Sequence, residues 1–261
     1  MPGSEPQFLT VGAGENARHI AYRSHLSQNP EAAGVFWLSG FMSDMGSSKA
    51  TALADWAQSS GRAFTGFDYS GHGVSGGDFK DGTIGRWLEE AEAVFCHLTS
   101  GPQIIVGSSM GGHIALLLLR RLMRAAPAAA ARVKGLVLIA PAWDMTEELM
   151  WQKFPLEAQR EIMTEGFHLR PSAYAAPYTI TRALIEDGRN HLLAREPFNP
   201  QRPVIILQGL LDPDVPAAHT RELLTFLTGN HARLIEIPDG EHRLSRPQDL
   251  EKLFEAVGSL I

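Results

Sequence analysis

The chain has 261 residues, of which 44% are hydrophobic and 20% are charged. This composition is typical of a globular protein and excludes a disordered or collagen-like chain. The formal charge of −6 argues against nucleic acid or an anionic membrane as the main partner. The single cysteine, Cys96, cannot form an internal disulfide, so nothing indicates an oxidising compartment.

The amino terminus carries no recognisable targeting signal. Residues 1–7 (MPGSEPQ) lack the basic and apolar regions of a secretory signal and the Arg-rich pattern of a transit peptide. The apolar run 114–119 stops at Arg120 and is far shorter than the ~20 residues that a membrane span needs. We therefore expect a protein without a membrane span that works in the cytoplasm.

Short apolar runs alternate with longer helical patterns along the chain, which is typical of βαβ units and a mostly parallel sheet. The pattern predicts an antiparallel edge hairpin at 7–11 and 19–24, then strands at 34–39, 63–68, 103–107, 134–140, 203–208 and 233–238. Helices are predicted between them, at 47–60, 83–99, 110–125, 217–228 and 248–260. We expect an α/β fold whose helices cover both faces of the sheet.

The predicted helix at 83–99 has an apolar stripe formed by Ile84, Leu88, Ala91 and Phe95 at helical spacing. This stripe predicts a face that packs against the sheet. Cys96 follows the stripe directly, and we expect a small core residue there rather than a nucleophile.

About sixty residues between the strands ending at Ala140 and starting at Pro203 contain no convincing strand. They are rich in aromatic residues and prolines, and a structureless loop of this size is uncommon. We expect two or three short helices that form a lid over residues 142–200, inserted within a single domain of residues 1–261. The alternative is a helical excursion that only covers the edge of the sheet.

The strongest local signal is the G-x-S-x-G sequence at 107–111, directly after an apolar strand and directly before a helical run. In that context it predicts a nucleophile elbow, a sharp turn that lifts Ser109 above the sheet. Small neighbours permit the turn, and the helix N-terminus favours developing negative charge. The alternative is that Ser109 is an ordinary helix N-cap.

A serine nucleophile needs a general base oriented by an acid, in the chain order Ser, acid, His. His242 follows the last strand in a loop at its carboxyl end, the edge where open α/β sheets bind ligands. The loop after the preceding strand offers two candidate acids, Asp212 and Asp214. Asp212 is favoured because the following proline holds its backbone extended. Asp144, after an earlier strand, is a third candidate.

Acyl transfer also needs two N–H donors for an oxyanion. The backbone of Met110 is predicted to supply one and that of Phe41, after the first parallel strand, the other. Gly40 would permit the close approach, unless it merely ends the strand. The glycine-dense turn at 68–77 lacks the P-loop ending, and no His or Cys cluster has metal-ligand spacing. We expect neither a cofactor nor a metal.

Together these motifs resemble the α/β-hydrolase superfamily over nearly the whole chain. The resemblance is narrower to the mitochondrial abhydrolase-domain depalmitoylase family, also known as acyl-glucuronide esterases, and its bacterial relatives. It depends on long matches: GFMSDMGSSKA at 40–50, FDYSG at 67–71, TIGRW at 83–87, GPQIIVGSSMGG at 101–112 and EHRL at 241–244.

The resemblance implies a Ser109–Asp212–His242 triad, oxyanion donors at Phe41 and Met110, and a helical lid over an acyl pocket. It implies hydrolysis of acyl thioesters or acyl esters, of a small molecule or an acylated protein. No transit peptide is visible, so we expect a bacterial cytoplasmic enzyme rather than a mitochondrial one.

The apolar side chains of the predicted lid suggest an acyl-binding surface formed by Met145, Met150, Trp151 and Phe154. These residues could equally pack against the sheet. Two rival functions use the same scaffold. One is a small-ester carboxylesterase or C–C bond hydrolase with the same triad, and the other is a non-catalytic ligand receptor.

Overall fold

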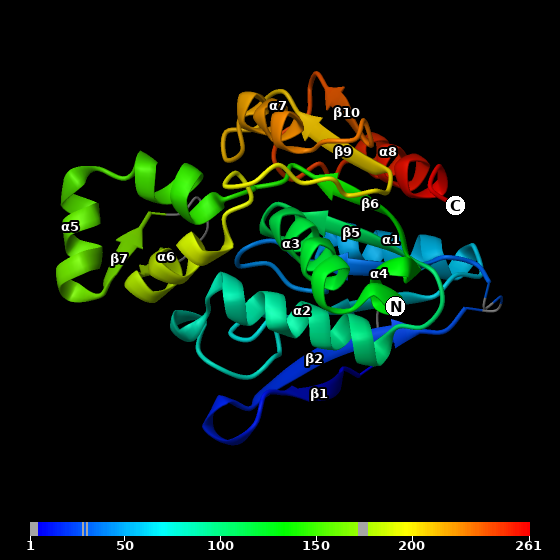
Figure 1. Cartoon of the computed structure of the whole chain (residues 1–261), viewed down its shortest axis with the longest axis horizontal. Helices are drawn as coiled ribbons and strands as arrows, with labels where there is room; N and C mark the ends of the chain where they lie inside the picture. Colours follow the sequence, from blue (N-terminus) through cyan, green and yellow to red (C-terminus); the bar gives the residue numbers. More distant parts are fainter. Residues whose placement is uncertain (1–4, 28, 30, 172–176) are drawn as a thin grey trace.

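A computed structural model describes residues 5–171 and 177–261, apart from 28 and 30. Within these residues a central sheet has eight strands in the order β1-β2-β4-β3-β5-β6-β9-β10 (Figure 1). The strands are β1 (Gln7–Val11), β2 (Arg18–His25), β3 (Gly34–Leu38), β4 (Phe64–Phe67), β5 (Gln103–Ser108), β6 (Val133–Ile139), β9 (Val204–Gly209) and β10 (Ala232–Ile237).

The sheet is parallel except at one edge. β1 pairs with β2 and β2 pairs with β4 in antiparallel register, while the pairs from β4 to β10 are parallel. The predicted edge hairpin and the mostly parallel sheet are therefore confirmed. Because the six parallel strands point the same way, the loops that follow them gather at one edge of the sheet.

Alternate residues of each central strand point to opposite faces and enter two separate apolar clusters. Val35 and Trp37 of β3 pack with α1 (Ser48–Ser59) and α8 (Pro247–Gly258). Phe36 and Leu38 belong to the larger cluster on the other face, with α2 (Ile84–Leu98), α3 (Met110–Ala125) and α7 (Ala217–Phe226). Both faces are covered, so the strands are continuously apolar, as predicted.

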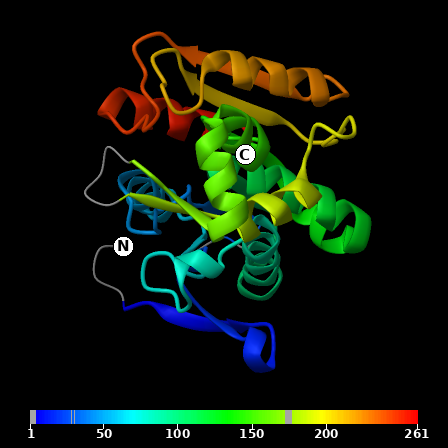
Figure 2. The ribbon, with the colours of Figure 1, turned by 90° about the vertical axis from the view of Figure 1, so that its left-hand side faces the viewer.

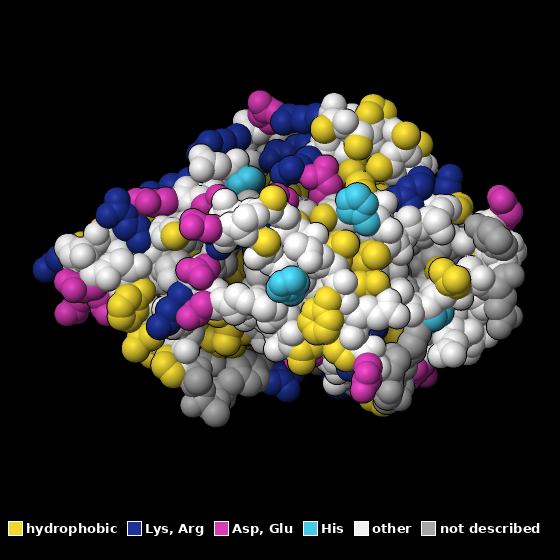
Figure 3. Space-filling model, turned by 90° about the horizontal axis from the view of Figure 1, so that it is seen from below, with side chains coloured by type: hydrophobic (Ala, Val, Ile, Leu, Met, Phe, Trp, Pro, Cys, Tyr) yellow, Lys and Arg dark blue, Asp and Glu magenta, His cyan; other side chains and the backbone are white. Residues whose placement is uncertain are grey.

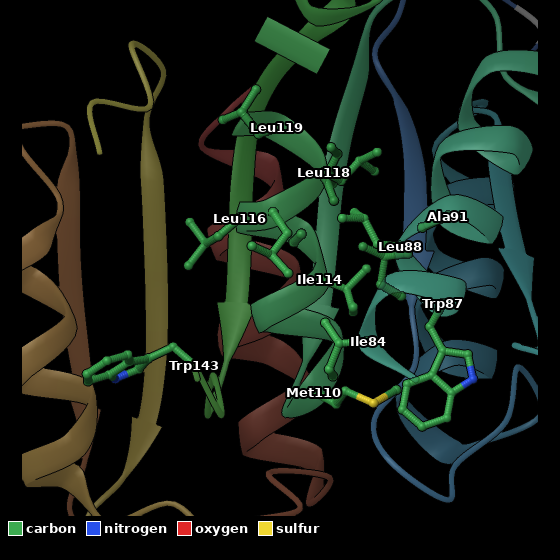
Figure 4. Packing of buried hydrophobic residues seen from close by; sticks show 14 of the residues in the cluster. Ile84, Trp87, Leu88, Ala91, Met110, Ile114, Leu116, Leu118, Leu119 and Trp143 are labelled. Atoms are coloured by element: carbon green, nitrogen blue, oxygen red, sulfur yellow. The ribbon is translucent and has the colours of Figure 1, made fainter. Parts of the chain in front are cut away.

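The predicted apolar stripe of α2 faces α3. Ile84, Leu88 and Ala91 are buried, and Figure 4 shows Ile84 and Leu88 pointing toward Ile114 of α3. The prediction for Cys96 was wrong, because its side chain is exposed. One residue step turns a helix by about 100°, which carries Cys96 off the buried stripe that ends at Phe95.

The 142–200 insertion leaves the sheet between β6 and β9 and projects from the edge where the parallel strands end (Figures 1 and 2). It contains η3 (Thr146–Met150), η4 (Trp151–Lys153), α5 (Leu156–Glu165), β7 (Phe167–Arg170), β8 (Tyr178–Thr181), α6 (Arg182–Gly188) and η5 (Arg189–His191). Residues 172–176 lie outside the described residues.

The expectation that the insertion holds short helices without a strand was wrong in part. β7 and β8 form an antiparallel hairpin that is separate from the central sheet. Each strand is four residues long, and β7 leaves Phe167 and Leu169 exposed. Such short strands, with little burial to mark them, carry a weak sequence signal.

The two ends of the insertion are tied together at Asp144. Its buried carboxylate accepts hydrogen bonds from the backbone N–H groups of Leu193 (2.6 Å) and Ala194 (3.0 Å). Beside it, the Trp143 indole donates to the backbone carbonyl of His219 (2.7 Å), and the two rings stack with centroids 4.4 Å apart. The insertion is thus anchored both to itself and to α7.

Charged side chains of both signs lie on the face of the insertion that is visible in Figure 3, among hydrophobic and other side chains. On the face in Figure 3, Lys and Arg side chains are interspersed with Asp and Glu side chains toward that end of the molecule. None of the helices in the described part of the chain combines the length and apolar character needed to cross a lipid bilayer.

Two glycines allow the β5–α3 turn to fit against its surroundings. A Cβ on Gly111 would lie 2.1 Å from the Leu38 carbonyl oxygen, and one on Gly107 would lie 2.2 Å from the Gly111 carbonyl oxygen. Both contacts are with backbone, which cannot rotate away. The glycines of the G-x-S-x-G sequence are therefore required sterically at these positions.

We predict that Gly111→Ala lowers the free energy of unfolding by at least about 1–3 kcal/mol, the usual effect of overpacking a dense core. Urea denaturation measures the change. Gly258→Ala is the matched control, because a Cβ there meets no described atom within 4 Å. Equal stability of the two variants would contradict the steric requirement.

Candidate active site

Ser109 sits at the sharp turn between β5 and α3. Its backbone has φ 55° and ψ −118°, a conformation that non-glycine residues rarely adopt. The turn is held by the Ser109 N–H, which donates to the Ile139 carbonyl (2.8 Å), and by Ala142, whose N–H donates to the Ser109 carbonyl (3.1 Å). Among the described residues, the Ser109 side chain makes no capping hydrogen bond. This disfavours the N-cap alternative.

The hydroxyl of Ser109 meets the imidazole of His242. The Nε2 atom of His242 lies 3.1 Å from Ser109 Oγ, and its Nδ1 lies 2.8 Å from Asp212 Oδ2. Because a carboxylate can only accept, Nδ1 carries the proton that bonds Asp212, which leaves the Nε2 lone pair facing the hydroxyl. Three loops that are far apart in the sequence thus place these side chains in one hydrogen-bonded line.

Asp212 is the one of the three candidate acids that contacts His242. Its side chain is fully buried, and Oδ1 accepts from the N–H groups of Asp214 (2.9 Å) and Val215 (2.8 Å). Asp214 is exposed and contributes its backbone. Asp144 instead ties the ends of the insertion, so its carboxylate is occupied elsewhere.

The loop after β3 lies directly against Ser109. A Cβ on Gly40 would sit 3.3 Å from Ser109 Cβ, so this glycine lets the backbone approach the hydroxyl closely. Phe41 follows in this loop. Met110 is the first residue of α3, where backbone N–H groups have no partner within the helix. Both predicted oxyanion donors therefore belong to segments that flank Ser109.

Asp68, which the sequence analysis did not single out, holds the loop after β3. Its buried carboxylate accepts from the N–H groups of Met45 (2.7 Å) and Val74 (3.0 Å). Burial raises the pKa of Asp68, and these two hydrogen bonds oppose that shift. An acid at the end of an apolar strand and before a glycine-dense turn is the signal that could have found it.

The glycine-dense turn at 68–77 and the insertion meet around the Phe41 ring. The ring centroid of Phe41 lies 5.0 Å from Phe79, 6.0 Å from Trp87 and 5.8 Å from Tyr178 of β8. His72 of the turn packs edge-on to the same rings and is buried. The turn thus supports the loop after β3 and connects it to the insertion.

The four residues predicted to bind substrate fall into two groups. Met145 and Met150 are buried in the larger core cluster. Trp151 is partly buried, with the Arg189 guanidinium 4.8 Å from its ring centroid. Phe154 lines a cavity of about 430 Å³ in the insertion, whose described lining includes Lys153, Ala158, His168 and Arg170 but not Ser109, Asp212 or His242.

One group of side chains in the described part of the chain has the geometry to hold a cation: Asp212, Asp214 and His242, with ligand atoms within 4.8 Å of one another. However, Asp212 Oδ2 and His242 Nδ1 already share a 2.8 Å hydrogen bond. A cation would have to displace that proton, so the arrangement suits an oriented imidazole better than a metal centre.

The family comparison matches the model of the alpha/beta hydrolase family over residues 34–253. The mitochondrial palmitoyl-protein thioesterase ABHD10 of Bos taurus is 30% identical over 247 residues, 93% of this chain and 76% of that protein. A putative hydrolase from Agrobacterium vitis S4 superposes with a TM-score of 0.95 at 42% identity, covering 98% of each chain. Alpha/beta hydrolase domain-containing protein 10 from mouse gives a TM-score of 0.83 at 28% identity, also covering 98% of each chain.

Two histidines near the site make stability depend on pH. Burial lowers the pKa of His113, next to Asp144, from 6.5 to about 3, and that of His219 from 6.5 to about 4. Below pH 6.5 the two histidines become protonated in the unfolded chain but stay neutral in the folded chain. The free energy of unfolding should therefore fall between pH 6.5 and pH 4, by up to about 1.4 kcal/mol per pH unit for each histidine.

Chemical denaturation across this range measures the slope. We predict that His113→Gln makes it shallower than His97→Gln does, since His113 is fully buried and His97 lies at an exposed position of α2. If stability falls as steeply with pH in His113→Gln as in the unaltered chain, then burial of a neutral His113 is not a cause of the pH dependence.

Proposed function

The chain is a hydrolase of the alpha/beta hydrolase family, and we propose that it cleaves acyl thioesters or acyl esters through Ser109, His242 and Asp212. The observation that carries the proposal is the pair of hydrogen-bond distances at His242, 3.1 Å to Ser109 Oγ and 2.8 Å to Asp212 Oδ2. A nucleophile, a base and an orienting acid in this geometry suit acyl transfer.

In the proposed first step, Ser109 Oγ attacks the carbonyl carbon of the substrate while His242 Nε2 takes the hydroxyl proton. Asp212 stabilises the imidazolium that forms. The backbone N–H groups of Phe41 and Met110 donate to the oxyanion of the tetrahedral intermediate. The carbon–sulfur or carbon–oxygen bond then breaks, and the leaving group takes the proton from His242.

In the second step, water attacks the acyl group on Ser109. His242 takes a proton from the water, and collapse of the second tetrahedral intermediate releases the carboxylic acid and returns the proton to Ser109 Oγ. The partly exposed His242, with 23% of its side chain accessible, can be reached by this water, whereas the Asp212 side chain is fully buried. The mechanism needs no group beyond the chain and water.

We propose residues 142–200 as a lid within a single catalytic domain of residues 1–261. Aromatic packing of Tyr178 on Phe41 supports this role because it joins the insertion to the loop beside the nucleophile. Among the predicted acyl contacts, partly buried Trp151 and Phe154 are better candidates than Met145 and Met150, which are buried in the core.

The single cysteine is free and exposed, which fits the proposed location in the reducing cytoplasm.

The relatives named palmitoyl-protein thioesterases favour a long-chain acyl thioester as substrate. Two observations favour a short-chain ester instead. Two of the four candidate acyl contacts are buried in the core, and the described lining of the cavity beside Phe154 includes none of the three proposed catalytic residues. A small-ester carboxylesterase is therefore the second candidate function.

We predict that Ser109→Ala loses nearly all activity, with a residual rate of about 10³-fold over water from binding and the oxyanion donors. The measurement is a paired assay of acyl thioesters and oxygen esters from acetyl to palmitoyl. Ser108→Ala, at the adjacent strand position, is the control and should keep both activity and labelling by a fluorophosphonate probe. Normal turnover by Ser109→Ala would refute the proposed nucleophile, and no preference beyond acetyl would favour the carboxylesterase.

We predict that Asp212→Asn lowers kcat by roughly 10⁴-fold, the effect known for the equivalent change in the best-studied triad, because the amide favours the wrong imidazole tautomer. Asp144→Asn should instead weaken the anchor of the insertion and lower thermal stability while leaving most of kcat. If Asp144→Asn instead loses kcat and Asp212→Asn keeps it, Asp144 is the acid that orients His242.

A further inference from the structure

Gln208, near the end of β9, lies beside the acid and contacts the same carboxylate oxygen as His242. The whole residue is buried, and its Nε2 atom faces three oxygen atoms: the carbonyls of Gly209 (2.9 Å) and Val215 (3.0 Å), and Asp212 Oδ2 (3.4 Å). Its Oε1 atom accepts a 2.6 Å hydrogen bond from the hydroxyl of Thr220, which is also fully buried, on α7.

The orientation of the Gln208 amide follows from its neighbours. Reversing the amide would place Oε1 against three oxygen atoms, none of which can donate a proton. It would also separate Oε1 from the Thr220 hydroxyl. The Thr220 donor and the three acceptors therefore select one orientation, in which Nε2 points toward Asp212.

The contacts of Gln208 bracket the acid loop. Asp212 Oδ2 is the oxygen atom that also contacts His242 Nδ1, and Val215 supplies both an N–H group to Asp212 Oδ1 and a carbonyl to Gln208. The two amide hydrogens of Gln208 face three acceptor oxygen atoms. The contact with Asp212, at 3.4 Å, is the longest of the three. Gln208 thus restrains both the carboxylate and the backbone that carries it.

We propose that Gln208, oriented by Thr220, is a positioning residue that sets the direction of the Asp212 carboxylate toward His242. This inference rests on the proposed function, because it assigns to these buried side chains a task in the same reaction. A carboxylate whose orientation is fixed by a second hydrogen-bond donor keeps His242 aligned as the imidazolium forms. Loss of the restraint should lower kcat and leave KM nearly unchanged, because Gln208 and Thr220 are both fully buried and out of reach of a substrate.

The test is a set of variants at Thr220 whose side chains differ in the hydroxyl. Thr220→Val and Thr220→Ala remove the donor and leave Gln208 Oε1 buried without it, whereas Thr220→Ser keeps it. We expect kcat and the rate of fluorophosphonate labelling of Ser109 to fall about tenfold in the first two variants, with little change in KM. Thr220→Ser should retain most of both rates. Gln208→Met, which removes both ends of the amide, should fall at least as far.

Thr65→Val is the matched control, because Thr65 is a buried threonine of β4 away from the acid loop. Thermal unfolding of every variant identifies those that are folded at the assay temperature. Val at position 220 keeps the volume of the side chain and Ala reduces it, so an effect common to both variants comes from loss of the hydroxyl. Wild-type kcat and labelling rate in folded Thr220→Val or Thr220→Ala would overturn the inference, as would a Thr220→Ser variant as slow as Thr220→Val. If Ser109→Ala is inactive while these results occur, the inference fails but the proposed function stands; an active Ser109→Ala would refute the proposed function itself.

Discussion

The close approach of the β5–α3 turn to the end of β3 is the constraint on which the rest of the site depends. Gly111 packs against the backbone of Leu38, and Gly40 packs against the side chain of Ser109. Residues with a Cβ at either position would push the two segments apart. The turn and the loop after β3 are therefore held next to each other by backbone contact, and the Ser109 hydroxyl and the neighbouring N–H donors share one small space.

Three buried carboxylates are a second feature of this edge of the sheet. Asp68, Asp144 and Asp212 are each buried, and each accepts hydrogen bonds from two backbone N–H groups of loop residues, which for Asp68 lie in two different loops. A buried carboxylate without hydrogen-bond donors would be strongly destabilising. Each acid therefore requires the loop conformation that supplies its donors. The loop after β3, the base of the insertion and the acid loop are each held in this way.

The same arrangement explains how the insertion relates to the site. Asp144 joins its two ends, Trp143 and His219 attach it to α7, and Tyr178 packs against Phe41. α7 also carries Thr220, one residue after His219. The short helix α7 therefore anchors the insertion and carries the threonine that we propose to orient Gln208 toward Asp212.

Local sequence determined the central strands, most of the helices, the turn at Ser109 and the family resemblance, because short apolar runs, apolar residues at helical spacing and glycines at a sharp turn act through near neighbours. The sequence offered three candidate acids and favoured Asp212. The tertiary structure places the Asp212 carboxylate in hydrogen-bond contact with His242, whereas Asp144 is bonded to Leu193 and Ala194; the two loops meet only across the edge of the sheet. The β7–β8 hairpin, the exposure of Cys96 and the hydrogen bonds of Asp68, Gln208 and Thr220 were evident only in the tertiary structure. The hairpin strands are short and little buried, Cys96 lies one residue beyond the buried stripe of α2, and the side-chain hydrogen bonds join separate loops and elements, so no local pattern marked any of them.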